Sequence, residues 1–341
     1  MLPEIKYYYF SRAFQGFSNM LDQFRKLLFS ISLLLLLGVS GVFAQQEPQF
    51  TQNMFNISSV NPGHFGMSDG VCVTGLMREQ WLGFKDDMGN KVAPETFVIS
   101  ADAPFKIIHG GVGISIVQDK IGFYKDMIIK LGYSYHATMG TGKLGIGINA
   151  SFLNKSADFG ENMIAADPAD EVLTSLASTK GVIFTDISSG VFYSSPKLYL
   201  STSSTQILQS SKYLSKESKN GKFTLRRHYY FTGGYDLTFP AFPGYVLTPS
   251  LYLKSDGTTM QADLNALVTY NKKVWGGASY RFNETFAMMV GFRYNDIDVG
   301  YSYDIPMTRI SAWGSHEIMI RYLFKIEREK VRSGYRNTRF L

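Results

Sequence analysis

The chain has 341 residues and a formal net charge of +6 at pH 7, and this positive excess lies at its two ends. Residues 1–44 hold four basic and two acidic residues, and residues 325–341 hold six basic and two acidic residues. The whole chain has 34 basic and 28 acidic residues, so the body between these two ends has 24 of each. This balance excludes a nucleic-acid-binding stripe on the body. The single cysteine, Cys72, excludes an intramolecular disulfide and a thiol metal cluster, and 18% charged with 15% aromatic residues favours lipid-facing strands over a soluble domain.

A secretory signal is predicted at the amino end, over residues 1–44. Arg25–Lys26 precedes an uncharged run from residue 27 to residue 46 that ends in Val42-Phe43-Ala44, with small residues at the two positions that a signal peptidase reads. We expect cleavage before Gln45, and Met20 is an alternative start of the chain. A membrane-spanning helix is the competing interpretation, because a run of this length can cross a bilayer.

Residues 45–70 show no sustained helical or strand period and are predicted to form a periplasmic leader. Asn61 and Pro62 indicate a turn. Phe50 and Phe55 favour a leader that packs, either as a plug in the lumen of a barrel or under its mouth. A flexible leader is the alternative.

Residues 71–324 show the two-residue period of β-strands. Between residues 286 and 294, for example, Met288, Val290 and Phe292 share one face, and Met289 and Gly291 share the other. Pro249 weakens one candidate strand, because proline removes a ladder hydrogen bond. Fourteen strands are predicted, over residues 71–81, 95–103, 110–118, 127–136, 143–152, 184–194, 197–204, 227–237, 244–253, 262–270, 273–281, 286–294, 297–304 and 315–324.

The predicted connections alternate between long and short. The odd-numbered ones span residues 82–94, 119–126, 153–183, 205–226, 254–261, 282–285 and 305–314, whereas the even-numbered ones have about two to six residues. A β-sandwich has no reason to sort its connections in this way, but a transmembrane antiparallel β-barrel of the outer membrane does, with both termini in the periplasm. A short surface helix is expected near residues 167–178, where Asp167 and Pro168 resemble a helix start.

No catalytic, cofactor or metal site is expected. The five histidines are scattered, and the sequence has no G-x-S-x-G, H-E-x-x-H or Walker motif. A catalytic trio assembled from distant strands remains an alternative.

Five segments of the chain form a set of motifs in a fixed order. They are the leader EPQFTQNMFNISSVNPGHFG, LMREQWLGF (76–84), GVGISIVQDKIG (111–122), GYSYD (300–304) and HEIMIRYLF (316–324). In this order they resemble the PorP/SprF family of outer-membrane proteins of the type IX secretion system. The resemblance implies a non-enzymatic, integral outer-membrane barrel that binds and anchors, or helps to export, surface proteins with type IX C-terminal signals, including adhesins of gliding motility. It also implies contact with periplasmic ring or motor components. A passive porin or small-solute transporter is the alternative function.

Ten residues are candidates for partner binding, in three groups. At the outer end of the first strand, arginine and tryptophan are favoured at binding hot spots, although an aromatic girdle beside lumen charges would look the same. The basic tail, residues 325–341, would dock an acidic periplasmic partner or else be a solvated end. The candidates are Arg78, Gln80, Trp81 and Phe84 at the rim, Phe50 and Phe55 in the leader, and Arg332, Arg336, Arg339 and Phe340 in the tail.

Overall fold

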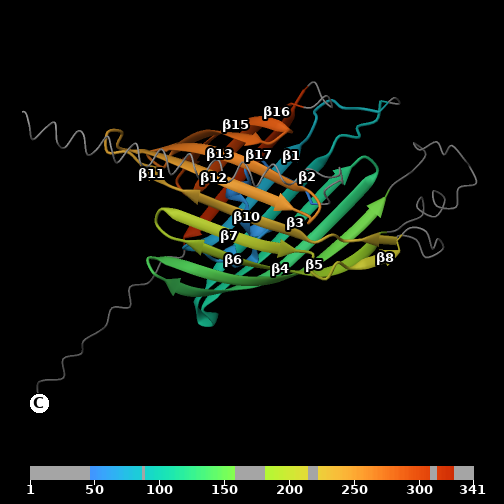
Figure 1. Cartoon of the computed structure of the whole chain (residues 1–341), viewed down its shortest axis with the longest axis horizontal. Helices are drawn as coiled ribbons and strands as arrows, with labels where there is room; N and C mark the ends of the chain where they lie inside the picture. The colour runs from blue at the N-terminus through green and yellow to red at the C-terminus, as the bar shows by residue number, and fades with distance from the viewer. Residues whose placement is uncertain (1–46, 87–88, 158–180, 214–221, 308–312, 326–341) are drawn as a thin grey trace, which may run out of the picture. The chain divides into compact units, whose positions relative to one another are not determined.

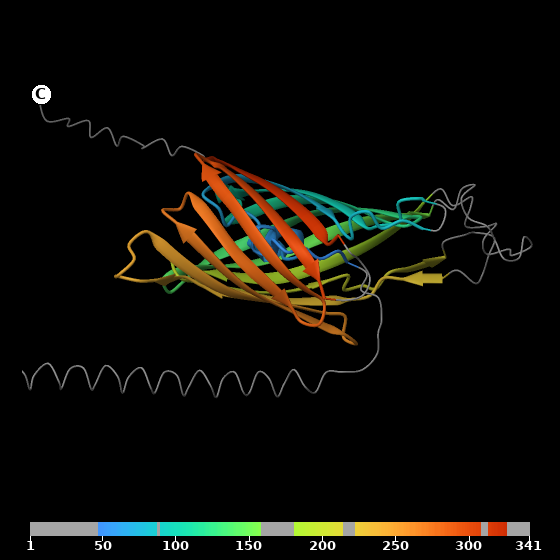
Figure 2. The same cartoon turned by 90° about the horizontal axis from the view of Figure 1, so that it is seen from above.

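The computed structural model describes residues 47–86, 89–157, 181–213, 222–307 and 313–325. Fourteen strands form one closed antiparallel barrel (Figures 1 and 2). These are β1 (Gly70–Glu79), β2 (Glu95–Phe105), β3 (Gly110–Ile121), β4 (Tyr124–Met139), β5 (Gly142–Ala157), β6 (Val182–Ser194), β7 (Leu198–Thr205), β10 (His228–Tyr235), β12 (Tyr245–Ser255), β13 (Met260–Tyr270), β14 (Val274–Arg281), β15 (Thr285–Tyr294), β16 (Ile297–Pro306) and β17 (Ser315–Lys325).

Neighbouring strands in the barrel are neighbours in the chain, and the sheet closes where β1 pairs with β17, from Gly70 opposite Lys325 to Glu79 opposite His316. The pairing of β10 with β12 completes the ring, which skips β11 (Leu237–Thr238). Outside the barrel sheet, β8 (Ser211–Tyr213) and β9 (Lys222–Thr224) form a hairpin. The predicted fourteen-stranded barrel is therefore confirmed.

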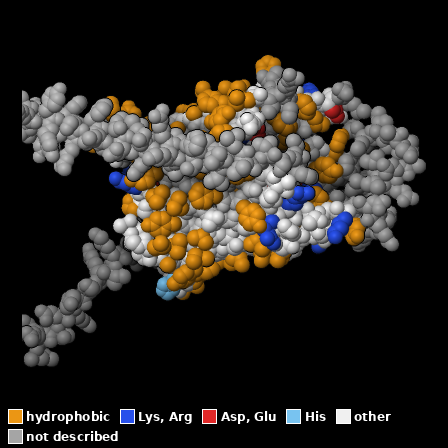
Figure 3. All heavy atoms as spheres, in the orientation of Figure 1, with side chains coloured by type: hydrophobic (Ala, Val, Ile, Leu, Met, Phe, Trp, Pro, Cys, Tyr) orange, Lys and Arg blue, Asp and Glu red, His pale blue; other side chains and the backbone are white. Residues whose placement is uncertain are grey.

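The outer surface of the strands is apolar. On β15, Met288 and Val290 are more than half exposed, whereas the intervening Ala287 and Met289 are buried. Figure 3 shows hydrophobic side chains spread over the strands in this view. A closed sheet leaves no unpaired strand edge, so such a surface can lie in hydrocarbon with every backbone group of the ladder paired.

No helix among the described residues is long and apolar enough to span a bilayer. Those present are single 3₁₀ turns: η1 (Asn53–Phe55), η2 (Ile57–Ser59), η3 (Pro62–His64) and η4 (Lys106–Ile108).

The two ends of the barrel carry different connections. We call one end the long-loop mouth; its connections are residues 80–94, 122–123, 158–181, 206–227, 256–259, 282–284 and 307–314. We call the other end the short-turn mouth; its connections are residues 106–109, 140–141, 195–197, 236–244, 271–273 and 295–296.

One connection is much shorter than predicted. The expected loop over residues 119–126 contains only Gly122 and Phe123, because the β3–β4 ladder continues to the pair Ile121 and Tyr124. Gly122, with φ of 56°, supplies the left-handed conformation that a tight turn requires.

Pro249 lies inside β12 without breaking it. The ladder from β12 to β10 ends at Ser250, and the ladder to β11 begins at Leu247. Proline therefore lies in the gap between the two ladders, where its missing N–H costs no hydrogen bond on that side.

Three predictions fall on residues outside the described ranges. They are the signal peptide of residues 1–44, the helix near residues 167–178, and the basic tail beyond Lys325 with Arg332, Arg336, Arg339 and Phe340.

Candidate functional site

The lumen of the barrel is occupied by the chain's own residues 47–69, which we call the leader segment. Figure 2 shows this segment, with its 3₁₀ turns, inside the ring of strands. Gln52, Asn61 and Phe65 are almost completely buried there. Its contacts reach strands all around the barrel, so it lies in the lumen and not against one side of it.

The amino end of the leader segment lies at the long-loop mouth. Lys254, near the end of β12, donates a hydrogen bond to the Glu47 main-chain carbonyl, and the Tyr230 hydroxyl donates one to the Glu47 carboxylate. The Lys130 ammonium lies 3.7 Å from the same carboxylate. Gln49 donates to Asp263 on β13, at 3.0 and 3.1 Å, so four separate strands hold the first leader residues.

These surroundings keep Glu47 ionised. Burial opposes ionisation, but the electrostatic attraction of Lys130 and His228 and the hydrogen bond from Tyr230 outweigh it, and together they lower the pKa of Glu47 from 4.5 to about 2. Because the pKa is lower in the folded state, this contribution to stability is complete above pH 4.5 and is lost as the pH falls towards 2.

We therefore expect the amino end of the leader segment to detach between pH 4.5 and pH 2. The fluorescence of Trp275, whose ring lies 4.7 Å from that of Phe55, can report the detachment in a chain where the other two tryptophans are replaced by phenylalanine. Glu47→Gln should remove this transition and leave the leader loosened at every pH. If the fluorescence of the Glu47→Gln chain followed the same pH titration as that of the chain with Glu47, then Glu47 would not control the detachment.

A second cluster holds the next leader residues to β1, β16 and β17. The Arg78 guanidinium lies 2.7 Å from the Asp304 carboxylate and 3.1 Å from the Glu317 carboxylate. Glu317 also accepts hydrogen bonds from the main-chain N–H groups of Thr51 and Gln52, at 2.9 and 2.7 Å. All the members are buried, so the leader backbone completes a network of charges inside the barrel.

The carboxyl end of the leader segment lies towards the short-turn mouth. The Asn61 carboxamide oxygen accepts from the N–H of Gly63 and so caps η3, while its amide nitrogen donates to Ser201 and to the Val191 carbonyl. Asp102 on β2 accepts from Ser58 and from the N–H of Gly66. The chain therefore runs the length of the lumen before it enters β1.

Glycines on the inner wall make room for this passage. A methyl group added at Gly147 would lie 2.3 Å from the Pro62 carbonyl carbon, and one at Gly145 would lie 2.1 Å from the Gly63 oxygen. Contacts this short do not occur in real structures, so β5 must present glycine wherever the leader backbone lies directly against it.

The two ends of the described chain lie at opposite mouths. Gly70 and Lys325, where the barrel begins and ends, are paired at the short-turn mouth, as an even number of strands requires. Because the leader segment crosses the lumen first, Glu47 lies at the long-loop mouth. The even number of strands led us to expect both termini at the same mouth. The leader segment changes this for the amino end, because it crosses the lumen before β1 begins.

The structure places some of the candidate partner-binding residues in the lumen and others at the long-loop mouth. Arg78 is 2% exposed and is held by two carboxylates, so its side chain points into the lumen and not outward from the rim. Phe50 is buried, and Phe55 packs on Trp275. Of the candidates that the structure describes, only Gln80, Trp81 and Phe84 lie at a mouth, where Phe84 is exposed and packs edge-on against Trp81.

Sequence reasoning missed the groups that seat the leader segment: Asn61, Glu47 with Lys130 and Lys254, and the inner-wall glycines. The alternate spacing of Gly145 and Gly147, on the face opposite the apolar one, was the available signal. Among the described residues no group of histidine, cysteine, aspartate and glutamate side chains could hold a metal ion.

Residues 42–322 match the model of a family described as type IX secretion system membrane protein PorP/SprF. A comparison with curated proteins finds no match.

Solved structures with a similar outline share little sequence with this chain. The Acinetobacter baumannii outer membrane protein Omp33 is 9% identical, with a TM-score of 0.43, over 76% of this chain and 100% of that one. The Ralstonia pickettii toluene transporter TbuX is 11% identical, with a TM-score of 0.45, over 78% of this chain and 92% of that one. The Pseudomonas putida toluene transporter TodX is 12% identical, with a TM-score of 0.41, over 80% and 93%. These values are too low to carry an argument about transport.

Proposed function

The chain belongs to the PorP/SprF family of type IX secretion system membrane proteins, and from this premise we propose that it works by binding exported proteins and not by catalysis or passive diffusion. It is an integral β-barrel of the outer membrane. Its partners would be surface proteins with type IX C-terminal signals, such as adhesins, and periplasmic ring or motor components.

The filled lumen is the observation that carries this proposal. A porin needs a water-filled bore, but here the leader segment lies along the lumen and is held by buried charges at its amino end and by close backbone contacts at its carboxyl end. A barrel closed in this way can serve as a rigid platform for binding at its mouths.

Three features of the long-loop mouth favour it as the binding site for the exported protein. Trp81 and Gln80 line a cavity of about 380 Å³ together with Glu47 of the leader segment. Trp81 adopts a left-handed conformation, with φ of 49°, which is uncommon for a large side chain and often marks a functional site. Beside it, the N–H of Leu82 donates to the carbonyl of Gly314, which brings two loops together, and Trp313 is 69% exposed.

The first test is purification of the tagged protein from outer membranes in mild detergent. Type IX signal-bearing proteins should co-purify with the wild type and with a Phe292→Ala control, whose exposed aromatic ring lies on the apolar outer face. The amount of these proteins that co-purifies should decrease at least tenfold in the double variant Trp81→Ala, Phe84→Ala, which corresponds to a loss on the order of 1.4 kcal/mol of binding free energy. An isolated protein that conducts ions through a planar bilayer would favour the porin alternative.

The path of the leader segment predicts which ends of the chain are accessible. If the long loops face the cell surface, an epitope inserted before Glu47 should be stained by antibody on intact cells. An epitope at the carboxyl end should be stained only after the outer membrane is permeabilised. If both epitopes required permeabilisation, the orientation or the path of the leader would be wrong.

A further inference from the structure

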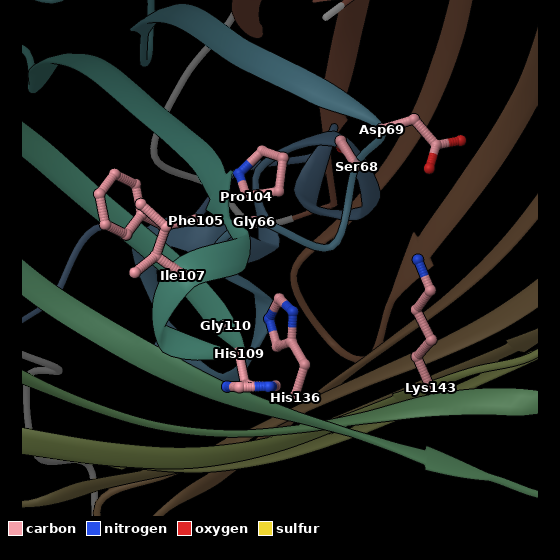
Figure 4. A pocket seen from close by; sticks show the side chains of 10 residues that line it. All are labelled: Gly66, Ser68, Asp69, Pro104, Phe105, Ile107, His109, Gly110, His136 and Lys143. Atoms are coloured by element: carbon pink, nitrogen blue, oxygen red, sulfur yellow. The ribbon is translucent and has the colours of Figure 1, made fainter. Parts of the chain in front are cut away.

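The short-turn mouth contains a cavity of about 560 Å³, within the range of ligand-binding pockets (about 300–1,000 Å³). Figure 4 shows that it is lined by the end of the leader segment, the β2–β3 turn and the lumen-facing ends of β4 and β5. Its lining includes Asp69, Phe105, Ile107, His109, His136 and Lys143.

Three charged or titratable side chains of this cavity have no protein partner. Within the described ranges no hydrogen bond or ion pair involves the side chains of Asp69, His109 or Lys143. The fourth such group, His136, is oriented by its Nε2 atom, which lies 2.9 Å from the Phe65 carbonyl oxygen. A carbonyl only accepts, so Nε2 donates, and Nδ1 of the neutral ring is left as an acceptor. The cavity thus offers both donors and acceptors to a ligand.

Apolar side chains lie at the edge of the cavity. Ile107 is 83% exposed at the tip of the β2–β3 turn, and Phe105, which shares the outer face of β2 with Phe97 and Ile99, is 46% exposed. An isoleucine at a turn tip gains nothing from contact with water, whereas burying it against an apolar side chain is favourable. A ligand for this cavity would therefore combine polar groups with an aliphatic or aromatic side chain.

The charge of the surrounding surface favours an acidic ligand. The six turns of the short-turn mouth contain four lysines and two aspartates: Lys106, Lys197, Lys272, Lys273, Asp236 and Asp296. Lys143 and Asp69 of the cavity itself cancel, so the turns leave an excess of two positive charges at this mouth, which attracts an acidic partner and speeds its encounter.

A peptide fits this cavity better than an anionic lipid does. His136 shares a strand face with Ser134, and Lys143 shares one with Gly145, and both of these neighbours contact the leader segment inside the lumen. Tyr135 and Ile146, on the opposite faces, are exposed on the outer surface. The sheet therefore separates the polar groups of the cavity from the surrounding lipid.

We propose that the short-turn mouth is a docking site for an acidic and apolar peptide segment of a periplasmic protein. Lys143 and His109 would donate hydrogen bonds to a carboxylate of the peptide, Asp69 would accept from its main-chain N–H groups, and an apolar side chain would pack on Ile107. This inference rests on the proposed function, since it gives the chemistry of the periplasmic partner, and it makes the leader segment part of the docking site.

The test uses the full-length mature protein in nanodiscs of zwitterionic lipid. The probe is a fluorescent, amidated peptide of six residues that alternates leucine with aspartate, and its counterpart alternates leucine with lysine. Fluorescence polarisation should show binding of the aspartate peptide only. Lys143→Ala should weaken this binding at least tenfold, and Ile107→Ser should weaken it as well. The matched control Lys272→Ala, at the same mouth but outside the cavity, should change it less than twofold.

Three results would overturn the inference. They are equal binding of the two peptides, equal effects of Lys143→Ala and Lys272→Ala, and loss of peptide binding when phosphatidylglycerol is added to the nanodiscs, which would make the site a lipid site. The co-purification of exported proteins depends on the opposite mouth, so it should be unchanged in Lys143→Ala. If exported proteins failed to co-purify with the wild type while the aspartate peptide still bound to it, the proposed function would be contradicted and the docking site would not.

Discussion

Replacing Arg78 by alanine is expected to destabilise the barrel by about 3–5 kcal/mol, the usual cost of breaking a buried ion pair by removing one partner. Arg78 has ion pairs with Asp304 at 2.7 Å and Glu317 at 3.1 Å, and the substitution would leave both carboxylates buried without a cation. Because Glu317 also holds the backbone of Thr51 and Gln52, the leader segment should loosen too. The measurement is urea-induced unfolding in detergent, followed by the shift of the folded barrel on gels.

Lys91→Ala is the matched control for this prediction. Lys91 likewise contacts two carboxylates, those of Glu79 and Glu95, but its side chain is 46% exposed. Exposed ion pairs contribute about 0–1 kcal/mol, so this variant should unfold almost like the wild type. Equal losses of stability in the two variants would show that burial of the Arg78 cluster is not what makes it important.

Gly147→Val is expected to force the leader segment away from the wall of the lumen and to convert a closed barrel into a conducting one. Even the first carbon of the new side chain would lie 2.3 Å from the carbonyl carbon of Pro62, and the atoms that it meets are backbone, which cannot rotate away. Valine is itself favoured in strands, so the barrel should still form. Single-channel recording in planar bilayers would measure the effect as openings that the wild type lacks.

The control for this prediction is Gly276→Val. Gly276 also lies in the middle of a strand, but a methyl group there meets its nearest atom, the Met289 oxygen, at 3.6 Å, an ordinary contact. This variant should remain closed. A protein lacking residues 47–66 should conduct at least as well as Gly147→Val, and a closed barrel in both cases would mean that the leader does not seal the lumen.

The sequence by itself determined the barrel. The alternation around Met288 and Val290 and the two-residue turn at Asn295 and Asp296 are local properties, set by the pleat of the strand and by turn geometry. Fourteen such segments, with connections sorted by length, leave a closed transmembrane sheet as the architecture that satisfies every strand edge. The shorter β3–β4 turn shows the limit of this reasoning, because a strand that continues beyond the membrane has no apolar signal at its end.

The interior was decided only by the tertiary structure. Lys254 reaches Glu47 across 207 positions of the sequence, and Arg78 reaches Asp304 across 226. In the sequence, a lysine or an arginine on the inner face of a strand looks the same whether it lines water, lies at a rim or holds a plug. The sequence therefore leaves both a lumen charge and a rim contact open for Arg78. Its partners depend on the register between β1 and β17 and on which strands face one another across the ring. Both follow from closure of the sheet around the leader segment, a property of the whole chain that no local pattern records.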